Sequence, residues 1–265
     1  MIPVRPTTVL LTGGTGTLGR SVLPLLRAAG RQVRILSRGT HPPFGGVDYV
    51  TGDLATGAGI EAAVAGAEIV LHCAGSQKGD DVKTRTLVDA AVPAGVRHLV
   101  YISVVGADLT PVVSTADRAM FGYLAAKRAS EEIIAASGMP WTTLRATQFH
   151  DLMLTTAEAL ARLPVIPVPS GTRVQPVDAG EVAARLVELT LGEPAGLVPS
   201  VAGPRVYPMA ELIRGYLRAT GKRRPIVPLR LPGQAARAFR AGANIAPDRA
   251  VGRRTWEAFL AERTR

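Results

Sequence analysis

The chain of 265 residues has one cysteine, four histidines and few aromatic side chains. A single cysteine excludes an intrachain disulfide, so we expect a reducing compartment, the cytoplasm. The histidines and the cysteine show no metal-ligand spacing, so we expect no metal site. Aromatic residues make up 5% of the chain, which leaves little for stacking on nucleic-acid bases.

Long hydrophobic runs are also missing. No stretch approaches the length of a membrane span, and the N-terminus lacks a signal-peptide pattern. Acidic residues are outnumbered, 21 against 31 Lys and Arg, which gives a net charge of +10. Twelve of the basic residues and three of the acidic ones lie between Arg218 and Arg265. They are scattered among apolar residues, which favours a solvated face, or one attracting anionic substrates or cofactor phosphates, over a nucleic-acid surface.

The most informative stretch that is present is a glycine-rich turn. An apolar run enters it at residues 9–11, and the spacing of Gly13, Gly16 and Gly19 gives a G-x-x-G-x-x-G pattern. In dinucleotide-binding turns one glycine makes the tight turn, one lets the backbone approach a pyrophosphate, and one lets the helix pack on the strand. A helix from near Leu18 to Gly30 would then point its first N–H groups at the phosphates.

A P-loop is the alternative interpretation of the same residues. Gly14, Gly19 and Ser21 fit it, but Arg20 stands where the phosphate-binding lysine belongs. The strand expected at residues 33–38 ends in Ser37 and Arg38, where NAD-binding proteins carry an acidic residue. An arginine there would pair with a 2′-phosphate, so NADP(H) is favoured over NAD(H).

Strand and helix patterns alternate through the first 150 residues. We expect strands at 47–50, 68–73, 98–105 and 141–145, helices at 58–65, 82–94 and 122–137, and a loop at 106–121. The alternation predicts an α/β fold with a doubly wound parallel sheet. Ligands bind outside the carboxyl ends of such strands. The glycine turn, Ala74, Gly75 and Ser103 would all lie at that edge.

The second half has shorter pieces, several punctuated by proline, with Asp178 as a helix N-cap. We predict a single domain with a dinucleotide-binding core at residues 1–150. Residues 151–265 would form a smaller substrate-binding cap with elements that return to the core. The substrate pocket would be lined by Thr147, Gln148, Phe149 and His150.

Taken together, these motifs resemble the short-chain dehydrogenase/reductase superfamily, above all its atypical, NmrA-like and isoflavone-reductase-like members. The matching pieces are residues 12–20, 37–38, 52–54, 103, 123–127 and 141–145. The resemblance implies a Rossmann fold with about seven parallel strands. It implies that Thr15, Thr17 and Leu18 meet the pyrophosphate, Asp53 and Leu54 the adenine, and Ala74 and Gly75 the nicotinamide ribose.

The resemblance also implies a Ser103, Tyr123 and Lys127 catalytic set. Tyr123 and Lys127 are four residues apart, so they share a helix face. A nearby ammonium stabilises a phenolate and lowers its pKa from about 10 toward neutrality. Tyr123 would then give a proton to a substrate carbonyl oxygen that Ser103 holds, and Lys127 would also bind the ribose hydroxyls.

The sequence therefore predicts an NADP(H)-dependent oxidoreductase that reduces a carbonyl, enone or quinone-like small molecule. Two alternatives stay open: a non-catalytic dinucleotide-sensing regulator, and an epimerase or dehydratase with tightly bound cofactor. The expected partner is a small-molecule substrate, with no nucleic acid and no membrane, in a monomer or homodimer.

Overall fold

A computed structural model of the chain describes residues 7–42, 46–76 and 78–263. The chain divides into two compact units built from interleaved segments. The sheet unit comprises Met1–Ser103, Ala126–Leu144 and Val182–Val198, and the second unit comprises Val104–Ala125, Arg145–Glu181 and Pro199–Arg265. The chain thus passes from one unit to the other five times. The predicted boundary at residue 150 stays a prediction.

The sheet unit is built on one seven-stranded sheet with the order β3-β2-β1-β4-β5-β6-β9. Neighbouring strands pair in parallel, which confirms the predicted doubly wound α/β fold. The strands are β1 (Thr8–Thr12), β2 (Gln32–Ser37), β3 (Asp48–Thr51), β4 (Ile69–His72), β5 (His98–Val104), β6 (Trp141–Ala146) and β9 (Gly196–Leu197). Apolar residues dominate β1 and β5 because both their faces are covered.

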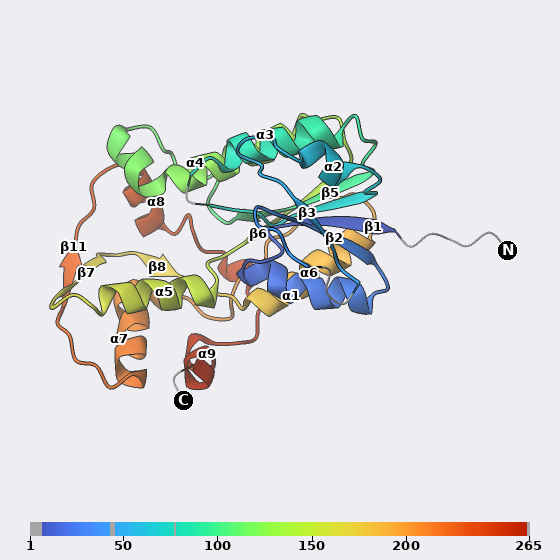
Figure 1. The fold of residues 1–265 in the computed structure, drawn as a ribbon. Helices are drawn as coiled ribbons and strands as arrows, with labels where there is room; N and C mark the ends of the chain where they lie inside the picture. The colour runs from blue at the N-terminus through green and yellow to red at the C-terminus, as the bar shows by residue number, and fades with distance from the viewer. Residues whose placement is uncertain (1–6, 43–45, 77, 264–265) are drawn as a thin grey trace. The chain divides into compact units, whose positions relative to one another are not determined.

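Helices cover both faces of this sheet. Figure 1 shows α2 (Ile60–Val64) and α3 (Asp80–Ala91) on one face, and α1 (Thr17–Ala28) and α6 (Ala179–Leu191) on the other. The C-terminal part of α4 (Thr115–Ala135) lies with α3. A buried core cluster joins strands, α2, α3 and α4 through Leu10, Ile60, Leu87, Leu99 and Ile134. This packing fixes where the carboxyl ends of the strands lie.

Helix α4 begins earlier than the sequence pattern predicts. The expected loop at 106–121 is wrong for residues 115–121, which are helical. The reason is a capping box: the Asp117 N–H donates to Ser114 Oγ at 3.0 Å, and the Ser114 N–H donates to Asp117 Oδ2 at 3.2 Å. The S-x-x-D spacing was the available signal. The predicted N-cap Asp178 is confirmed, because its carboxylate accepts from the Gly180 N–H at 2.8 Å.

The second unit contains two small sheets and five helices among its described residues, counting one short 3-10 turn and leaving aside the ends of α4 and α6. Strand β8 (Arg173–Val174) pairs antiparallel with β10 (Tyr207–Pro208), and β7 (Ile166–Pro169) pairs in parallel with β11 (Ile226–Leu229). The helices are α5 (His150–Leu160), α7 (Met209–Ala219), α8 (Gln234–Ala241), η1 (Pro247–Arg249) and α9 (Trp256–Arg263). A separate core around Trp256, Phe259 and Leu212 holds α5, α7 and α9 together. No described helix could cross a membrane.

Candidate cofactor-binding and catalytic site

The glycine turn connects β1 to α1, and two of its glycines leave no room for a side chain. Gly13 has φ of +70°, and a Cβ there would lie 2.7 Å from the backbone of Cys73 and Ala74. A Cβ on Gly19 would lie 2.2 Å from Gly13 O. Gly13 therefore makes the turn against the end of β4, and Gly19 lets α1 pack on the turn.

Gly16 is different, because its outer side is open. An added Cβ would meet one described atom, Gly13 O at 3.3 Å. Gly16 is also the N-cap of α1, so the first N–H groups of the helix, from Thr17 onward, have no partner inside the helix. An open glycine beside unpaired helix N–H groups suits the pyrophosphate of a dinucleotide. The residues present therefore fit the cofactor that the sequence predicts.

A buried hydrogen-bond chain holds the end of β4 against this turn. The Ala74 N–H donates to Thr12 Oγ1 at 3.1 Å, and Thr12 Oγ1 lies 2.7 Å from His72 Nδ1. His72 Nε2 lies 3.2 Å from Thr84 Oγ1, which in turn donates to Asp80 O at 2.8 Å. Because the single proton of Thr84 Oγ1 is donated to Asp80 O, Thr84 accepts from Nε2–H of His72, and His72 Nδ1 accepts from the Thr12 hydroxyl. These hydrogen bonds fix the position of Ala74, one of the two residues predicted to contact the nicotinamide ribose.

Burial shapes the protonation of the two residues before Ala74. Loss of solvent, together with the positive charges of Lys127 and Lys83, lowers the pKa of His72 to about 3. Burial raises the pKa of the Cys73 thiol to about 12, against a smaller lowering by Lys127. His72 is therefore neutral and Cys73 is a thiol at neutral pH, so neither acts as a charged catalyst.

Lys127 is buried beside the ends of β4 and β5, with 2% of its surface exposed. Its Nζ donates to Ile102 O at 3.2 Å and lies 3.3 Å from Asp80 Oδ2. A Cβ on Gly75 would lie 3.6 Å from the same Nζ. The structure thus brings the predicted Lys127 and Gly75 together. Asp80, in the first turn of α3, is a residue of this cluster that sequence reasoning missed.

Ser103 follows Ile102 on β5 and is 1% exposed. Its Oγ has no hydrogen-bond partner within the described part of the chain. Buried hydroxyls are nearly always paired, because leaving one unpaired costs about 1–3 kcal/mol. An unpaired hydroxyl in the strand that anchors Lys127 is therefore the kind of group that a substrate oxygen would satisfy.

The end of β2 carries the predicted adenosine contacts. Ser37 Oγ lies 2.8 Å from His41 Nε2 and accepts from the Gly39 N–H. Arg38 is exposed and forms no ion pair with any described residue. Its guanidinium is therefore available to a ligand. The Gly52 N–H donates to Ser37 O at 2.9 Å, which places the turn after β3 beside β2.

Asp53 and Leu54, in that turn, have structural contacts of their own. The Asp53 carboxylate accepts from the Ala55 N–H at 2.9 Å, and Leu54 packs in the core of the sheet unit. Their predicted contact with adenine stays a prediction. Asp53 retains a partly exposed carboxyl group, while the Leu54 side chain is committed to packing.

Tyr123 and the predicted pocket residues belong to the second unit. Tyr123 lies one helical turn before Lys127 on α4, and 36% of its surface is exposed. Gln148 bridges Asn244 O, at 2.9 Å, and the Gln175 N–H, at 3.1 Å. Thr147 Oγ1 accepts from the Gly203 N–H at 3.3 Å. Both polar side chains are therefore engaged in holding loops together.

His150 is fully buried, and its place in the substrate pocket stays a prediction. Its Nε2 donates to Arg254 O at 3.0 Å, and its ring stacks on Phe259 and Trp256. Burial lowers the pKa of His150 and is the largest of several influences on it. Phe149, the N-cap of α5, is partly exposed and supplies the apolar side chain among the four predicted pocket residues.

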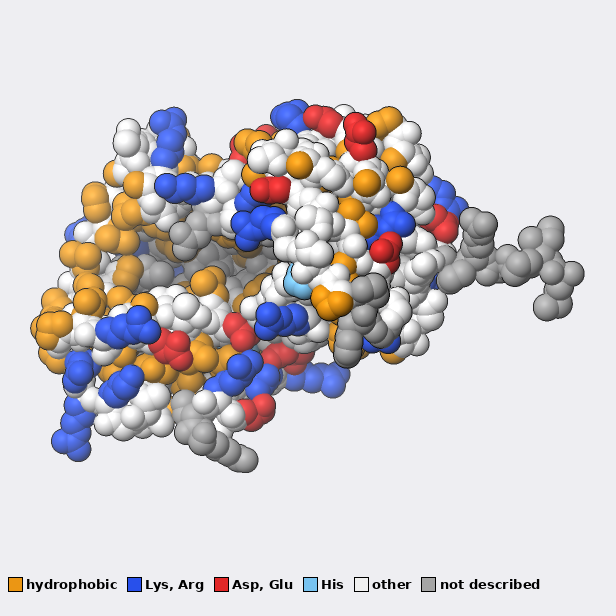
Figure 2. All heavy atoms as spheres, in the orientation of Figure 1, with side chains coloured by type: hydrophobic (Ala, Val, Ile, Leu, Met, Phe, Trp, Pro, Cys, Tyr) orange, Lys and Arg blue, Asp and Glu red, His pale blue; other side chains and the backbone are white. Residues whose placement is uncertain are grey.

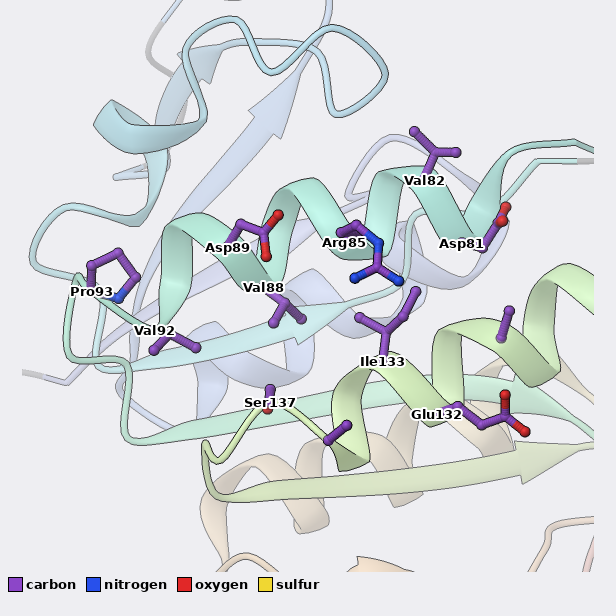
Figure 3. Close-up of a pocket in the computed structure, with 12 residues that line it drawn as sticks. Asp81, Val82, Arg85, Val88, Asp89, Val92, Pro93, Glu132, Ile133 and Ser137 are labelled. Carbon is purple, nitrogen blue, oxygen red and sulfur yellow. The ribbon is translucent and has the colours of Figure 1, made fainter.

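A surface cleft of about 720 Å³ lies elsewhere in the sheet unit, between α3 and α4. Figure 3 shows Val88 of α3 facing Ile133 of α4 across it, with Val92, the C-cap residue of α3, toward its end. None of the predicted site residues lines this cleft. We therefore place the candidate site at the strand ends and not here.

A family model described as NAD(P)H-binding matches residues 13–189, from the glycine turn to α6. The match covers more than half of the chain and includes the sheet unit's turn, Ser103 and Lys127. The chain belongs to the NAD(P)H-binding family. This membership confirms the predicted resemblance to atypical short-chain dehydrogenases and reductases.

Curated relatives and solved structures that resemble this chain support the same family assignment. Ceramide reductase of Caulobacter vibrioides is 30% identical over 244 residues, which cover 85% of this chain and 74% of the relative. Quinone oxidoreductase 2 of Escherichia coli is 25% identical, covering 81% and 75%. The structure of the Escherichia coli enzyme QOR2 with NADPH superposes with a TM-score of 0.79 at 20% identity, covering 97% of this chain and 100% of that one. The chain is thus an NAD(P)H-dependent reductase or dehydrogenase.

Proposed function

We propose that this chain is an NADPH-dependent reductase of a carbonyl, enone or quinone-like small molecule, with Tyr123 as the proton donor. The observation that carries the proposal is the buried, unpartnered Ser103 hydroxyl. Ser103 follows Ile102 on β5, and the Ile102 carbonyl oxygen accepts a hydrogen bond from Lys127 Nζ. Reductase names among the relatives support the reaction class.

The roles of the chain's own residues follow from their positions. Ser103 would donate a hydrogen bond to the substrate oxygen, which would pair its buried hydroxyl. Tyr123, one turn from Lys127 on α4, would give its phenolic proton to that oxygen. Lys127 is held in place by Ile102 O and Asp80. The cofactor, when bound, supplies the hydride.

Preference for NADPH is the second part of the proposal and depends on Arg38. Arg38 lies at the end of β2 and is exposed. The carboxylate of Asp48, on the paired strand β3, forms its ion pair with Arg34, at 2.8 Å. A free guanidinium without a neighbouring acid favours a 2′-phosphate. Thr15, Thr17, Leu18, Ala74 and Gly75 would hold the rest of the dinucleotide.

The proton-donor role is tested by Tyr123→Phe and Ser103→Ala, assayed by NADPH consumption over a panel of carbonyls, enones and quinones. We expect Tyr123→Phe to lower kcat about a hundredfold or more, the usual contribution of a general acid. Tyr49→Phe, on β3, is the matched control and should keep its activity. Full turnover in Tyr123→Phe would remove Tyr123 from the mechanism.

The cofactor preference is tested by fluorescence titration with NADPH and NADH. Arg38→Ala should weaken NADPH binding about ten- to a hundredfold and leave NADH binding unchanged, since only NADPH carries the 2′-phosphate. Arg27→Ala removes an exposed arginine at the far end of α1 and serves as the control. Equal loss for both cofactors would contradict the assignment.

The ion pair of Lys127 with Asp80 favours a second candidate, a dinucleotide-sensing protein without turnover. A carboxylate 3.3 Å from the ammonium opposes its effect on the tyrosine phenol. This candidate predicts NADPH binding with no consumption of NADPH across the same panel. An epimerase or dehydratase would instead be purified with oxidised cofactor already bound.

A further inference from the structure

The small parallel sheet of the second unit presents an apolar face to solvent. In β7, Ile166 and Val168 are buried, so the alternating Val165, Pro167 and Pro169 point away from the core. The register aligns Val227 with Pro167 and Leu229 with Pro169, so these side chains extend the same face. Val165 is 45% exposed, and Val227 and Leu229 are each 49% exposed. We call these five residues the apolar sheet face.

A basic cleft of about 530 Å³ lies at the start of β11, next to the same small sheet. Its lining includes Pro225, just before β11, and Ile226, the first residue of β11. It also includes five basic side chains: Arg214, Arg218, Lys222, Arg223 and Arg224. We call these five the basic rim. None of them forms an ion pair in the described part of the chain. Figure 2 shows Lys and Arg side chains gathered beside hydrophobic ones in the region of α7 and β11.

No acidic residue interrupts this surface in the sequence. Residues 212–247 contain eight Lys and Arg and no Asp or Glu, and residues 159–177 also lack an acid. Some other basic side chains of the second unit are paired, as Arg254 is with Asp178 at 2.6 Å. The positive charge around the apolar sheet face is therefore left uncompensated.

We propose that the apolar sheet face and the basic rim bind the surface of an anionic lipid bilayer. Exposed aliphatic side chains beside unpaired cations are what an interfacial membrane contact requires: the apolar groups enter the boundary of the acyl chains, and the cations meet the lipid phosphates. The sequence-based expectation of no membrane partner rested on the lack of a spanning run, and a surface contact needs none.

Other occupants fit this surface less well. A second copy of the chain would bring two basic rims together, and like charges repel. Nucleic acid is contacted through donors and stacking rings, and valine, leucine and proline supply neither on the apolar sheet face. An aliphatic face of about half-exposed residues is matched best by a partner that is both apolar and negatively charged.

Vesicle co-sedimentation of the full chain tests the proposal. We expect binding to phosphatidylcholine vesicles that contain about one third phosphatidylglycerol, weak binding to phosphatidylcholine alone, and release at high salt. Arg223→Gln with Arg224→Gln should weaken binding about thirtyfold, from two lost cations. Val227→Ser with Leu229→Ser should weaken it about tenfold by removing exposed apolar area.

Matched variants on the sheet unit provide the controls. Arg27→Gln with Arg85→Gln removes two exposed cations, and Val82→Ser with Leu197→Ser removes two aliphatic side chains that are 55% and 52% exposed. Both should bind vesicles as the parent chain does, and all four variants should unfold at the same temperature. Equal binding to uncharged vesicles, no binding to charged ones, or equal effects of test and control variants would overturn the proposal. So would a dimer in sedimentation velocity that Val227→Ser with Leu229→Ser abolishes, or vesicle binding absent while duplex DNA binds.

Discussion

At the scale of single residues, Gly19 shows how little space the glycine turn leaves. A Cβ there would lie 2.2 Å from Gly13 O and 2.5 Å from Gly14 Cα, and both are backbone atoms that cannot rotate away. We expect Gly19→Ala to lower the free energy of unfolding by about 1–3 kcal/mol and to abolish NADPH binding. Urea unfolding and fluorescence titration measure the two effects. Gly192→Ala, where no described atom lies closer than 3.4 Å to the new Cβ, should change neither.

His72 predicts how stability depends on pH. Its pKa is about 3 in the folded chain and about 6.5 in an unfolded one. Between these values the unfolded chain binds a proton that the folded chain does not, so stability is full above pH 6.5 and falls as the pH drops toward 3. The slope approaches roughly 1.4 kcal/mol per pH unit.

Urea unfolding between pH 7 and pH 5 measures this slope in His72→Gln. In this variant the slope of the unfolding free energy against pH should fall by close to the contribution of one histidine. His98 and His150, whose pKa values are also lowered by burial, should still contribute the remaining slope. The same substitution at the partly exposed His41 is the control. An unchanged slope in His72→Gln would mean that His72 is not held neutral.

Residues with a local signature were the ones that the sequence could identify. Gly13 and Gly19 are defined by their own backbone, and Arg38 follows a recognisable strand. Asp80 has no such signature, because its importance depends on Lys127, 47 positions later. The pocket role predicted for His150 follows from its place after β6 and stays a prediction, whereas its stacking on Trp256 and Phe259, more than a hundred positions away, has no local signature.

At the scale of elements, a buried ion pair connects α3 and α4. The side chains of Asp80 and Lys127 are 2% and 3% exposed, and their charged atoms are 3.3 Å apart. Removing one partner leaves a buried charge without compensation, which costs about 3–5 kcal/mol. We therefore expect Asp80→Asn and Lys127→Met each to be strongly destabilising, and the double variant to cost much less than their sum.

A double-mutant cycle by urea unfolding measures that coupling. The exposed pair of Arg97 with Glu68, at 2.6 Å, is the comparison. Because both of its side chains are in solvent, its coupling should stay below about 1 kcal/mol. Additive effects at Asp80 and Lys127 would show that the pair does not hold the two helices together.

Most elements could be predicted because their apolar periodicity is strong, as in β1, β5 and α1. The start of α4 has little periodicity, and its local signal is the S-x-x-D spacing of the Ser114 and Asp117 cap. Helix α8 was not expected either. It is eight residues long and lies between Gly233 and Gly242, so its periodic pattern is too short to stand out, and it is oriented by contacts such as the Ala235 N–H to Asp117 at 3.4 Å.

At the scale of the whole molecule, the two units share one chain that passes between them five times. A fragment of residues 1–150 would lack β9 and all of α6, and β9 and most of α6 belong to the sheet unit. We expect that fragment to show no cooperative unfolding transition by circular dichroism, while the full chain does. A cooperative transition in the fragment would show that α6 and β9 are dispensable for the sheet.

The same interleaving bears on how such a protein can change over evolution. A gene segment exchanged with a relative at any single breakpoint between residues 104 and 198 would replace pieces of both units and split at least one core. New specificity in this lineage is therefore expected to arise by point substitution and loop insertion within the second unit, and recombination that trades whole modules is disfavoured by the path of the chain itself.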